Sequence, residues 1–193
     1  QADILDTYEV LALAILEQVL MGNSASPLRK ALIDSGLGAA LSDSSGYSAD
    51  TRDTMFSIGL KGVELDAAEK IEKIVMDVLE DQAKNGIDPE LVESAIHQIE
   101  FHRKEVTNTP FPYGIKLLMS FGGPWFHGVD PVRMLQFDED LEKLKKEIAE
   151  GPFLEGKISQ YFIDNPHRVL FKLAPDKAKE EKESRRVTEE LEE

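Results

Sequence analysis

The sequence contains no cysteine, only one tryptophan and no long hydrophobic run among its 193 residues. Without cysteine, disulfide bonds and thiolate metal sites are excluded, which fits a reducing compartment. No stretch is long and apolar enough to span a bilayer, and the N-terminus lacks the pattern of a secretory signal. We therefore expect a protein of a reducing compartment that does not insert into membranes.

Basic residues are also few, because 22 lysines and arginines stand against 37 acidic residues and give a net charge of -15. Nucleic-acid binding needs clustered basic side chains for the phosphates, so this balance argues against a nucleic-acid partner. An acidic surface attracts cationic partners through its long-range field. The simpler interpretation is that the charge keeps the protein soluble.

Helical patterns, by contrast, fill most of the chain. Asp66 and Glu69 have the spacing of a capping box, and Asn85-Gly86 is a stop signal before a further helix. The two helices around that short turn should pack as an antiparallel pair. Trp125 follows a Gly-Gly-Pro break and is expected in a loop that fills the core. Amphipathic spacing and caps predict helices at 6–21, 27–35, 66–85, 88–99, 113–121, 138–148 and 153–163.

Strands are predicted in two places. Ser26, followed by proline, is a typical N-cap for a short helix that Gly36 would end. Strands at 39–47 and 54–61 follow it, and the first is small and polar in its middle. We therefore expect an edge strand beside a better-buried second strand. Alternating apolar residues predict a third strand at 168–173.

The fold class that these elements predict is α+β, an antiparallel sheet packed against several helices. Three strands are few for so many helices, so we infer that the chain lacks one or more N-terminal strands of the complete domain. Residues 176–193 are mostly charged and form a helix with almost no apolar face. Such a helix needs a partner or stays loosely ordered.

His97, Glu100 and His102 share one predicted helix and are candidate metal ligands by residue type. Helical zinc-peptidase motifs are His-x-x-Glu-His or His-Glu-x-x-His, whereas the spacing here is His-x-x-Glu-x-His. At about 100° per residue, His102 lies roughly 140° around the helix from His97. We interpret the three as surface residues. The inverted zinc motif, a Gly-x-Ser-x-Gly elbow and a phosphate loop are all absent from the sequence, so we predict neither catalytic nor metal-binding residues.

Several short motifs nevertheless follow one another in a characteristic order and spacing. They lie at 16–22, 26–28, 36–38, 56–62, 99–101, 112–114, 128–131, 164–168 and 175–176, with Trp125 between them. Together they resemble the pitrilysin/insulinase superfamily of zinc metallopeptidases, most closely the presequence-protease branch. The resemblance covers nearly the whole chain. It implies the second, non-catalytic domain of the N-terminal half of an enzyme that degrades unfolded peptides.

The resemblance also implies a binding site. In insulinase-like enzymes the first strand of this domain faces a closed chamber and can hold part of a peptide bound at the distant zinc. Backbone pairing carries over because it needs no particular side chain. The Ser-Asp-Ser-Ser centre is particular to this chain, so pocket chemistry does not carry over. The alternative is a solvated edge strand. By position, the substrate-binding strand would be Ala40, Leu41, Ser42, Asp43, Ser44, Ser45, Gly46 and Tyr47.

From the same resemblance we expect a domain at 1–174 and the start of a helical linker hairpin at 175–193. The expected partners are peptide substrates and the remaining domains of a parent protease, in the bacterial cytoplasm or an organelle matrix. Zinc is expected in the parent only, with no cofactor in this segment.

The sequence is also compatible with two other functions. The chain could be a structural, inactive subunit of the same superfamily, although a linker hairpin belongs to the one-chain protease layout. A free-standing peptide-binding module is disfavoured by the thin sheet. A zinc motif upstream of Gln1 would decide between the protease and the structural subunit.

Overall fold

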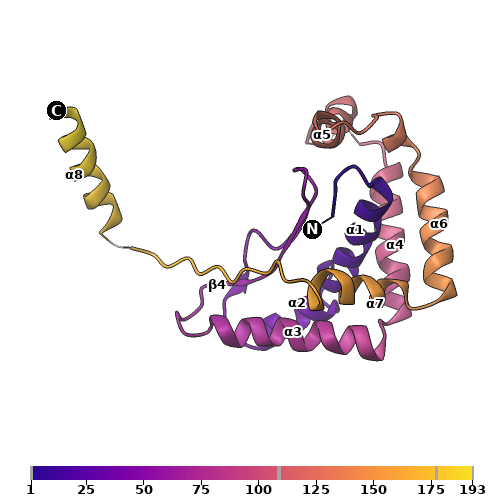
Figure 1. Ribbon diagram of the computed structural model, residues 1–193, viewed down its shortest axis with the longest axis horizontal. Helices are drawn as coiled ribbons and strands as arrows, with labels where there is room; N and C mark the ends of the chain where they lie inside the picture. Colours follow the sequence, from indigo (N-terminus) through magenta and orange to yellow (C-terminus); the bar gives the residue numbers. More distant parts are fainter. Residues whose placement is uncertain (1, 108–109, 177, 193) are drawn as a thin grey trace.

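The computed structural model describes residues 2–107, 110–176 and 178–192 (Figure 1). Its strands are short and antiparallel, and helices make up most of the rest, so the α+β class is confirmed. The helices are α1 Thr7–Met21, α2 Pro27–Asp34, α3 Ala68–Asn85, α4 Pro89–Lys104, α5 Tyr113–Phe126, α6 Phe137–Glu150, α7 Phe153–Ile158 and α8 Lys179–Glu192. The strands are β1 Ala40–Leu41, β2 Gly46–Ser48, β3 Met55–Ser57 and β4 Leu60–Lys61.

Helix α1 is the centre of the main core. The Asp6 carboxylate caps it by accepting a hydrogen bond from the Glu9 backbone N–H at 3.0 Å. Its apolar residues face in nearly every direction, and α2, α4, α6, α7 and β2 all pack against it. Ile15, Leu16 and Leu20 are completely or almost completely buried. Each such side chain contributes about 1.5–3 kcal/mol by leaving water, so α1 organises the domain.

Helix α2 begins where the sequence predicted, but the Ser26 hydroxyl does not play the predicted capping role. Ser26 occupies the N-cap position, but its hydroxyl makes no cap bond to the helix. The fully buried hydroxyl instead accepts from the Asn23 N–H at 3.1 Å and donates to the Gln18 carbonyl at 3.5 Å. Ser26 therefore fixes the turn between α1 and α2. Gly36 has φ +64° after the helix, as the predicted left-handed stop requires.

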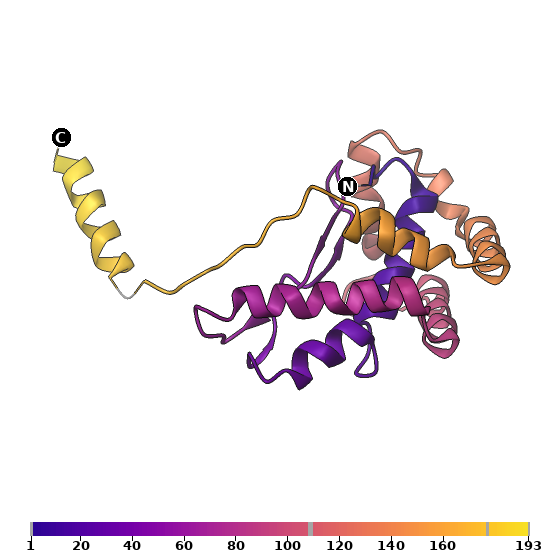
Figure 2. The same cartoon turned by 60° about the horizontal axis from the view of Figure 1, so that its bottom comes forward.

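The predicted antiparallel pair of helices is wrong, and so is the predicted capping box. Helix α3 starts after Ala67 without a side-chain cap. It packs against α2 and α7, whereas α4 packs against α1, so the two helices run in clearly different directions (Figures 1 and 2). The connection explains this: Gly86 has φ +92°, and the next N–H, of Ile87, donates to the Glu155 carboxylate at 3.1 Å. This contact with a distant residue sets the direction of α4.

Two apolar stretches lie at the surface rather than in the core. Trp125 and Phe126 form the last turn of α5 and are 55% and 88% exposed, so the predicted core-filling loop is wrong. Residues 168–173 are extended but join no β-ladder in the described chain, so the predicted third strand is wrong as well. Helix α8 follows this segment and stands away from the other helices (Figure 2). No helix in the described ranges is both long and apolar enough to cross a membrane.

Candidate functional site

The predicted substrate-binding strand is two short strands separated by a turn. β1 pairs with β4 through Ala40 opposite Lys61, and β2 pairs with β3 through Tyr47 opposite Phe56. Between these ladders, four residues on the first strand, 42–45, face only two on the second, 58–59. The continuous strand predicted from Ala40 to Tyr47 is therefore interrupted, and the register changes by two residues across the interruption.

A cluster of serine hydroxyls holds this turn. The Ser45 backbone N–H donates to the Ser42 carbonyl at 3.0 Å, and the two hydroxyl oxygens lie 2.9 Å apart. The Ser57 hydroxyl donates to the Ser44 carbonyl from the facing strand. Asp43 and Ser44 are exposed at the tip. Serine and aspartate favour turns because their side chains bond nearby backbone groups, so the Ser-Asp-Ser-Ser composition contained the signal that the strand prediction missed.

The position of the N-terminal residues identifies the outer edge of the sheet. The Thr54 N–H donates to the Ala2 carbonyl at 2.9 Å, and the Ile4 N–H donates to the Arg52 carbonyl at 3.0 Å. Residues 2–4 thus lie beside 52–54, on the side of that strand away from β2. No strand pairs with the other side of β1 and β2 within the described ranges. β1 and β2 therefore have an open edge on that side, as the sequence predicted, and each ladder has only two strands.

Alternation of backbone groups shows which residue of β2 presents its N–H and C=O to the open side. The backbone groups of Thr54 point toward Ala2. Those of Met55 and Ser57 therefore point the other way, toward β2, where these two residues lie opposite Ser48 and Gly46. Tyr47, between those two pairs, presents its backbone groups to the open edge.

The side chain of Tyr47 anchors this edge to the domain. It packs against the main core, and burial raises the pKa of the Tyr47 hydroxyl. Glu17 of α1 lies next to β2, with a carboxylate oxygen 4.0 Å from where a Cβ on Gly46 would be. Burial also raises the pKa of the Glu17 carboxyl. The open edge is thus backed by a half-buried acidic group.

The predicted strand at 54–61, now β3 and β4, was expected to be better buried than 39–47, and this is found only in part. Met55 is 58% exposed, while Phe56, Ile58 and Leu60 are half-buried. The Phe56 ring packs on Phe162 with centroids 4.7 Å apart.

The histidines and Glu100 of α4 do not form a metal site. His97 lies 3.6 Å from Glu93, and the His102 Nδ1 lies 2.7 Å from the Gln98 carbonyl. The Glu100 carboxylate accepts from Lys104 at 2.8 Å, and this bond, with the nearby Lys145 ammonium, lowers its pKa. Each group is engaged locally. Within the described part of the chain, no three histidine, aspartate or glutamate side chains come together as a metal would need.

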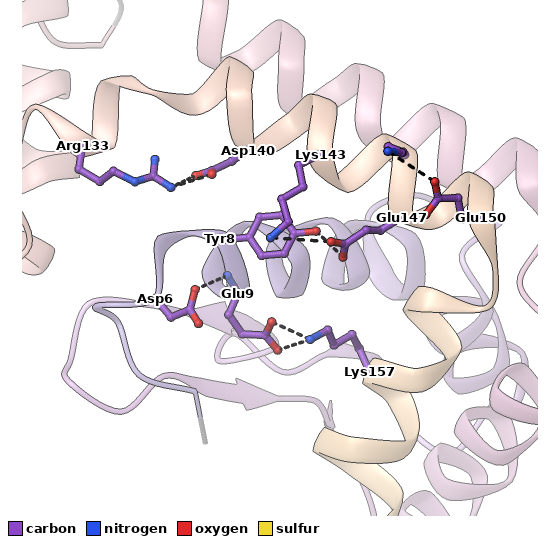
Figure 3. Close-up of polar contacts among 10 residues, drawn as sticks. Asp6, Tyr8, Glu9, Arg133, Asp140, Lys143, Glu147, Glu150 and Lys157 are labelled. Atoms are coloured by element: carbon purple, nitrogen blue, oxygen red, sulfur yellow. Dashed lines mark hydrogen bonds and ion pairs between the residues drawn. The ribbon is translucent and has the colours of Figure 1, made fainter.

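Sequence reasoning missed a set of polar contacts that joins α1 to α6 and α7 (Figure 3). The Lys157 ammonium donates to both Glu9 oxygens, at 2.8 and 2.7 Å, and both side chains are largely buried. The Tyr8 hydroxyl donates to Glu147 at 2.7 Å, with the Lys143 ammonium 3.8 Å from the Tyr8 ring centroid. Burial, followed by the bond to Glu147, raises the pKa of Tyr8. These pairs are far apart in sequence, so no local pattern indicates them.

Residues 1–99 match a family model described as the peptidase M16 inactive domain. The chain belongs to this family, which confirms the resemblance to the pitrilysin/insulinase group.

Relatives match over almost the whole chain. Presequence protease 1, chloroplastic/mitochondrial, of Arabidopsis thaliana is 37% identical over 97% of this chain and 18% of its own length. Protein HypA of Clostridium perfringens is 36% identical over 99% of this chain and 19% of its own length. The mitochondrial presequence protease of Mus musculus is 34% identical over 98% of this chain and 18% of its own length. The chain thus spans about a fifth of the length of these relatives.

Proposed function

We propose that this chain is the second, non-catalytic domain of a presequence-protease-like zinc metallopeptidase. In that parent it would form part of the wall of a closed chamber and hold unfolded peptides along the edge of β1 and β2. The observation that carries this proposal is the open edge at Tyr47, in a member of the peptidase M16 inactive-domain family. An extended peptide can add there through main-chain hydrogen bonds.

The interruption at 42–45 determines how a peptide would lie. Because the register changes by two residues, one straight peptide cannot pair with both β1 and β2 in a continuous ladder. The edge therefore offers two short binding segments. Main-chain pairing over so few residues gives modest affinity with little dependence on peptide sequence, which suits a protease that accepts many unfolded substrates.

Zinc would be held by residues outside this chain. The side chains of α4 do not fit a metal, because Glu100 is already paired with two lysines and the histidines point to separate partners. We propose accordingly that this domain binds and positions peptide, while hydrolysis takes place at a distant site in the parent.

The C-terminal part fits a connection between halves of a longer chain. Residues 1–174 would be the domain and 175–193 the start of a linker hairpin, since α8 is charged and stands apart from the domain. By analogy with the mitochondrial, chloroplast and bacterial relatives, the parent would act in an organelle matrix or the bacterial cytoplasm. A structural subunit without proteolytic activity is the alternative, and a parent that lacks a zinc motif would establish it.

Binding at the edge can be tested by NMR titration of the 193-residue protein. The probe is a basic peptide of about twelve residues, long enough to lie along a strand of ordinary length. We expect the Tyr47 amide signal to shift and its hydrogen exchange to slow, with little change at α4. The matched control is the same peptide with alternate backbone nitrogens methylated, which removes donors from one edge without changing the side chains.

The control decides the outcome. Loss of most of the affinity with the methylated peptide supports backbone pairing. Equal binding of the two peptides, or binding that leaves Tyr47 unchanged, would show that this edge is scaffold only.

A further inference from the structure

The carboxylate of Glu17, on α1, has no positively charged partner in the described part of the chain. No hydrogen bond or ion pair joins it to another described residue, and burial alone raises its pKa. The neighbouring carboxylates differ in this respect, because Glu9 is paired with Lys157 and Asp43 is paired with Lys61. A half-buried charge without a partner destabilises a fold, and such groups occur most often at functional sites.

This carboxylate lies beside the open edge of β2. Gly46 has no side chain, and a Glu17 oxygen lies 4.0 Å from the point where a Cβ on Gly46 would be. The carboxylate therefore lies next to the space that a side chain of residue 46 would occupy. A strand that adds to β2 meets Glu17 at this position instead of a cross-strand side chain.

The pairing pattern shows which residue of an added peptide would contact Glu17. The backbone groups of Gly46 point to Ser57, whereas those of Tyr47 point to the open side. In an added antiparallel strand, the residue opposite Gly46 therefore belongs to a non-hydrogen-bonded pair, in which side chains approach most closely. Cβ atoms of directly opposite residues are about 4.5–5.5 Å apart, so a long basic side chain at this peptide position reaches the Glu17 carboxylate.

We propose that Glu17 is a specificity-determining residue of this edge, which binds the lysine or arginine side chain of an extended peptide at the residue opposite Gly46. The inference rests on the proposed binding of peptides along β1 and β2, and it adds the class of peptide that the edge prefers. An acidic residue at the same peptide position is disfavoured, because its charge repels that of Glu17.

This preference differs from the general attraction of a protein with a net charge of -15 for basic peptides. The long-range field acts on the total charge of a peptide and is largely screened beyond about 8 Å at 0.15 M salt. The contact with Glu17 acts on one side chain at short range. Because the carboxylate is half-buried, salt weakens this contact less than it weakens an ion pair in open solvent.

The test compares two peptides of about twelve residues in NMR titrations of the 193-residue protein at 0.15 M salt. The peptides are identical except at one central position, which is lysine in one and norleucine in the other. Norleucine keeps the aliphatic chain and lacks the ammonium group. The Tyr47 amide signal reports binding at the edge. We expect the lysine peptide to bind about fivefold or more tightly than the norleucine peptide, since a partly buried pair exceeds an exposed one.

Two variants of the protein assign the preference to Glu17. Glu17→Gln should bind the two peptides equally, with the Tyr47 amide still shifted by both. The matched control is Glu80→Gln, which removes one carboxylate from the exposed side of α3 and should keep the preference.

The outcomes separate this inference from the proposed function. A preference for lysine that survives in Glu17→Gln overturns the inference and leaves edge binding intact. A preference that both variants lose belongs to the overall charge and overturns it as well. If neither peptide changes the Tyr47 amide in the unmodified protein, the proposed binding at the edge fails, and the inference fails with it.

Discussion

The ion pair between Glu9 and Lys157 gives the sharpest stability prediction. Their side chains are only 12% and 17% exposed, and the two oxygen–nitrogen distances are 2.7 and 2.8 Å. Removing one partner of a buried pair leaves the other charge without compensation and costs about 3–5 kcal/mol. We expect Lys157→Met to lower the free energy of unfolding by about 3 kcal/mol, because some solvent contact remains. Methionine keeps an unbranched chain of similar length at this position while it removes the charge.

Urea unfolding followed by circular dichroism measures this change, and an unchanged m-value would show that the transition stays comparable. The matched control is Lys73→Met, which removes a pair with Asp77 whose side chains are 73% and 59% exposed. Exposed pairs contribute little, so the control should cost about 0.5 kcal/mol or less. Replacing both members, Glu9→Leu with Lys157→Met, should recover most of the loss. If Lys157→Met behaves like Lys73→Met, or the double variant is no better than the single one, the pair does not act as a buried charge pair.

Other predictions concern pH, packing and order. Burial raises the pKa of Glu17, so its charge destabilises the folded protein only as the pH rises from the unfolded pKa through the folded one. In thermal melts, Glu17→Gln should therefore stabilise the protein at pH 7 and have almost no effect near pH 3. The exposed Glu80→Gln is the control and should not show this difference between the two pH values. Ser26→Ala removes the fully buried hydroxyl that accepts from the part-buried Asn23 N–H, and it should cost about 1–3 kcal/mol. Leu32→Ala, at a fully buried position, should cost about 2–5 kcal/mol, and the opposite order in urea would contradict the packing described. Amides of 179–192 should exchange rapidly in a dilute monomer, and strong protection would reveal an unrecognised partner.

Local signals in the sequence predicted local structure well. Asp88 caps α4 by accepting from the Glu90 N–H at 2.9 Å, at the residue where the helix 88–99 was predicted to begin. Gly36 adopts the left-handed conformation that ends a helix. The edge position of 40–47 could also be predicted, since it depended on small polar residues beside an apolar strand.

The errors arose where distant residues decide the structure. The directions of α3 and α4 depend on the bond from Ile87 to Glu155, which no helix pattern contains. Residues 168–173 have strand periodicity, but a strand also needs a neighbour, and none lies beside them in the described chain. Trp125 was expected in a core-filling loop after the Gly-Gly-Pro break, but its exposure depends on what packs against α5.

The central place of α1 has a consequence during synthesis. Residues such as Ile15 and Leu16 are covered partly by α4 and α7, which are made later. At about 5–20 residues per second, the ribosome needs roughly 7–30 s to pass from α1 to the end of α7. For that time the nascent chain carries a helix that is apolar on nearly every side without its cover. Binding of a chaperone to α1 before α7 emerges is the expected safeguard against aggregation.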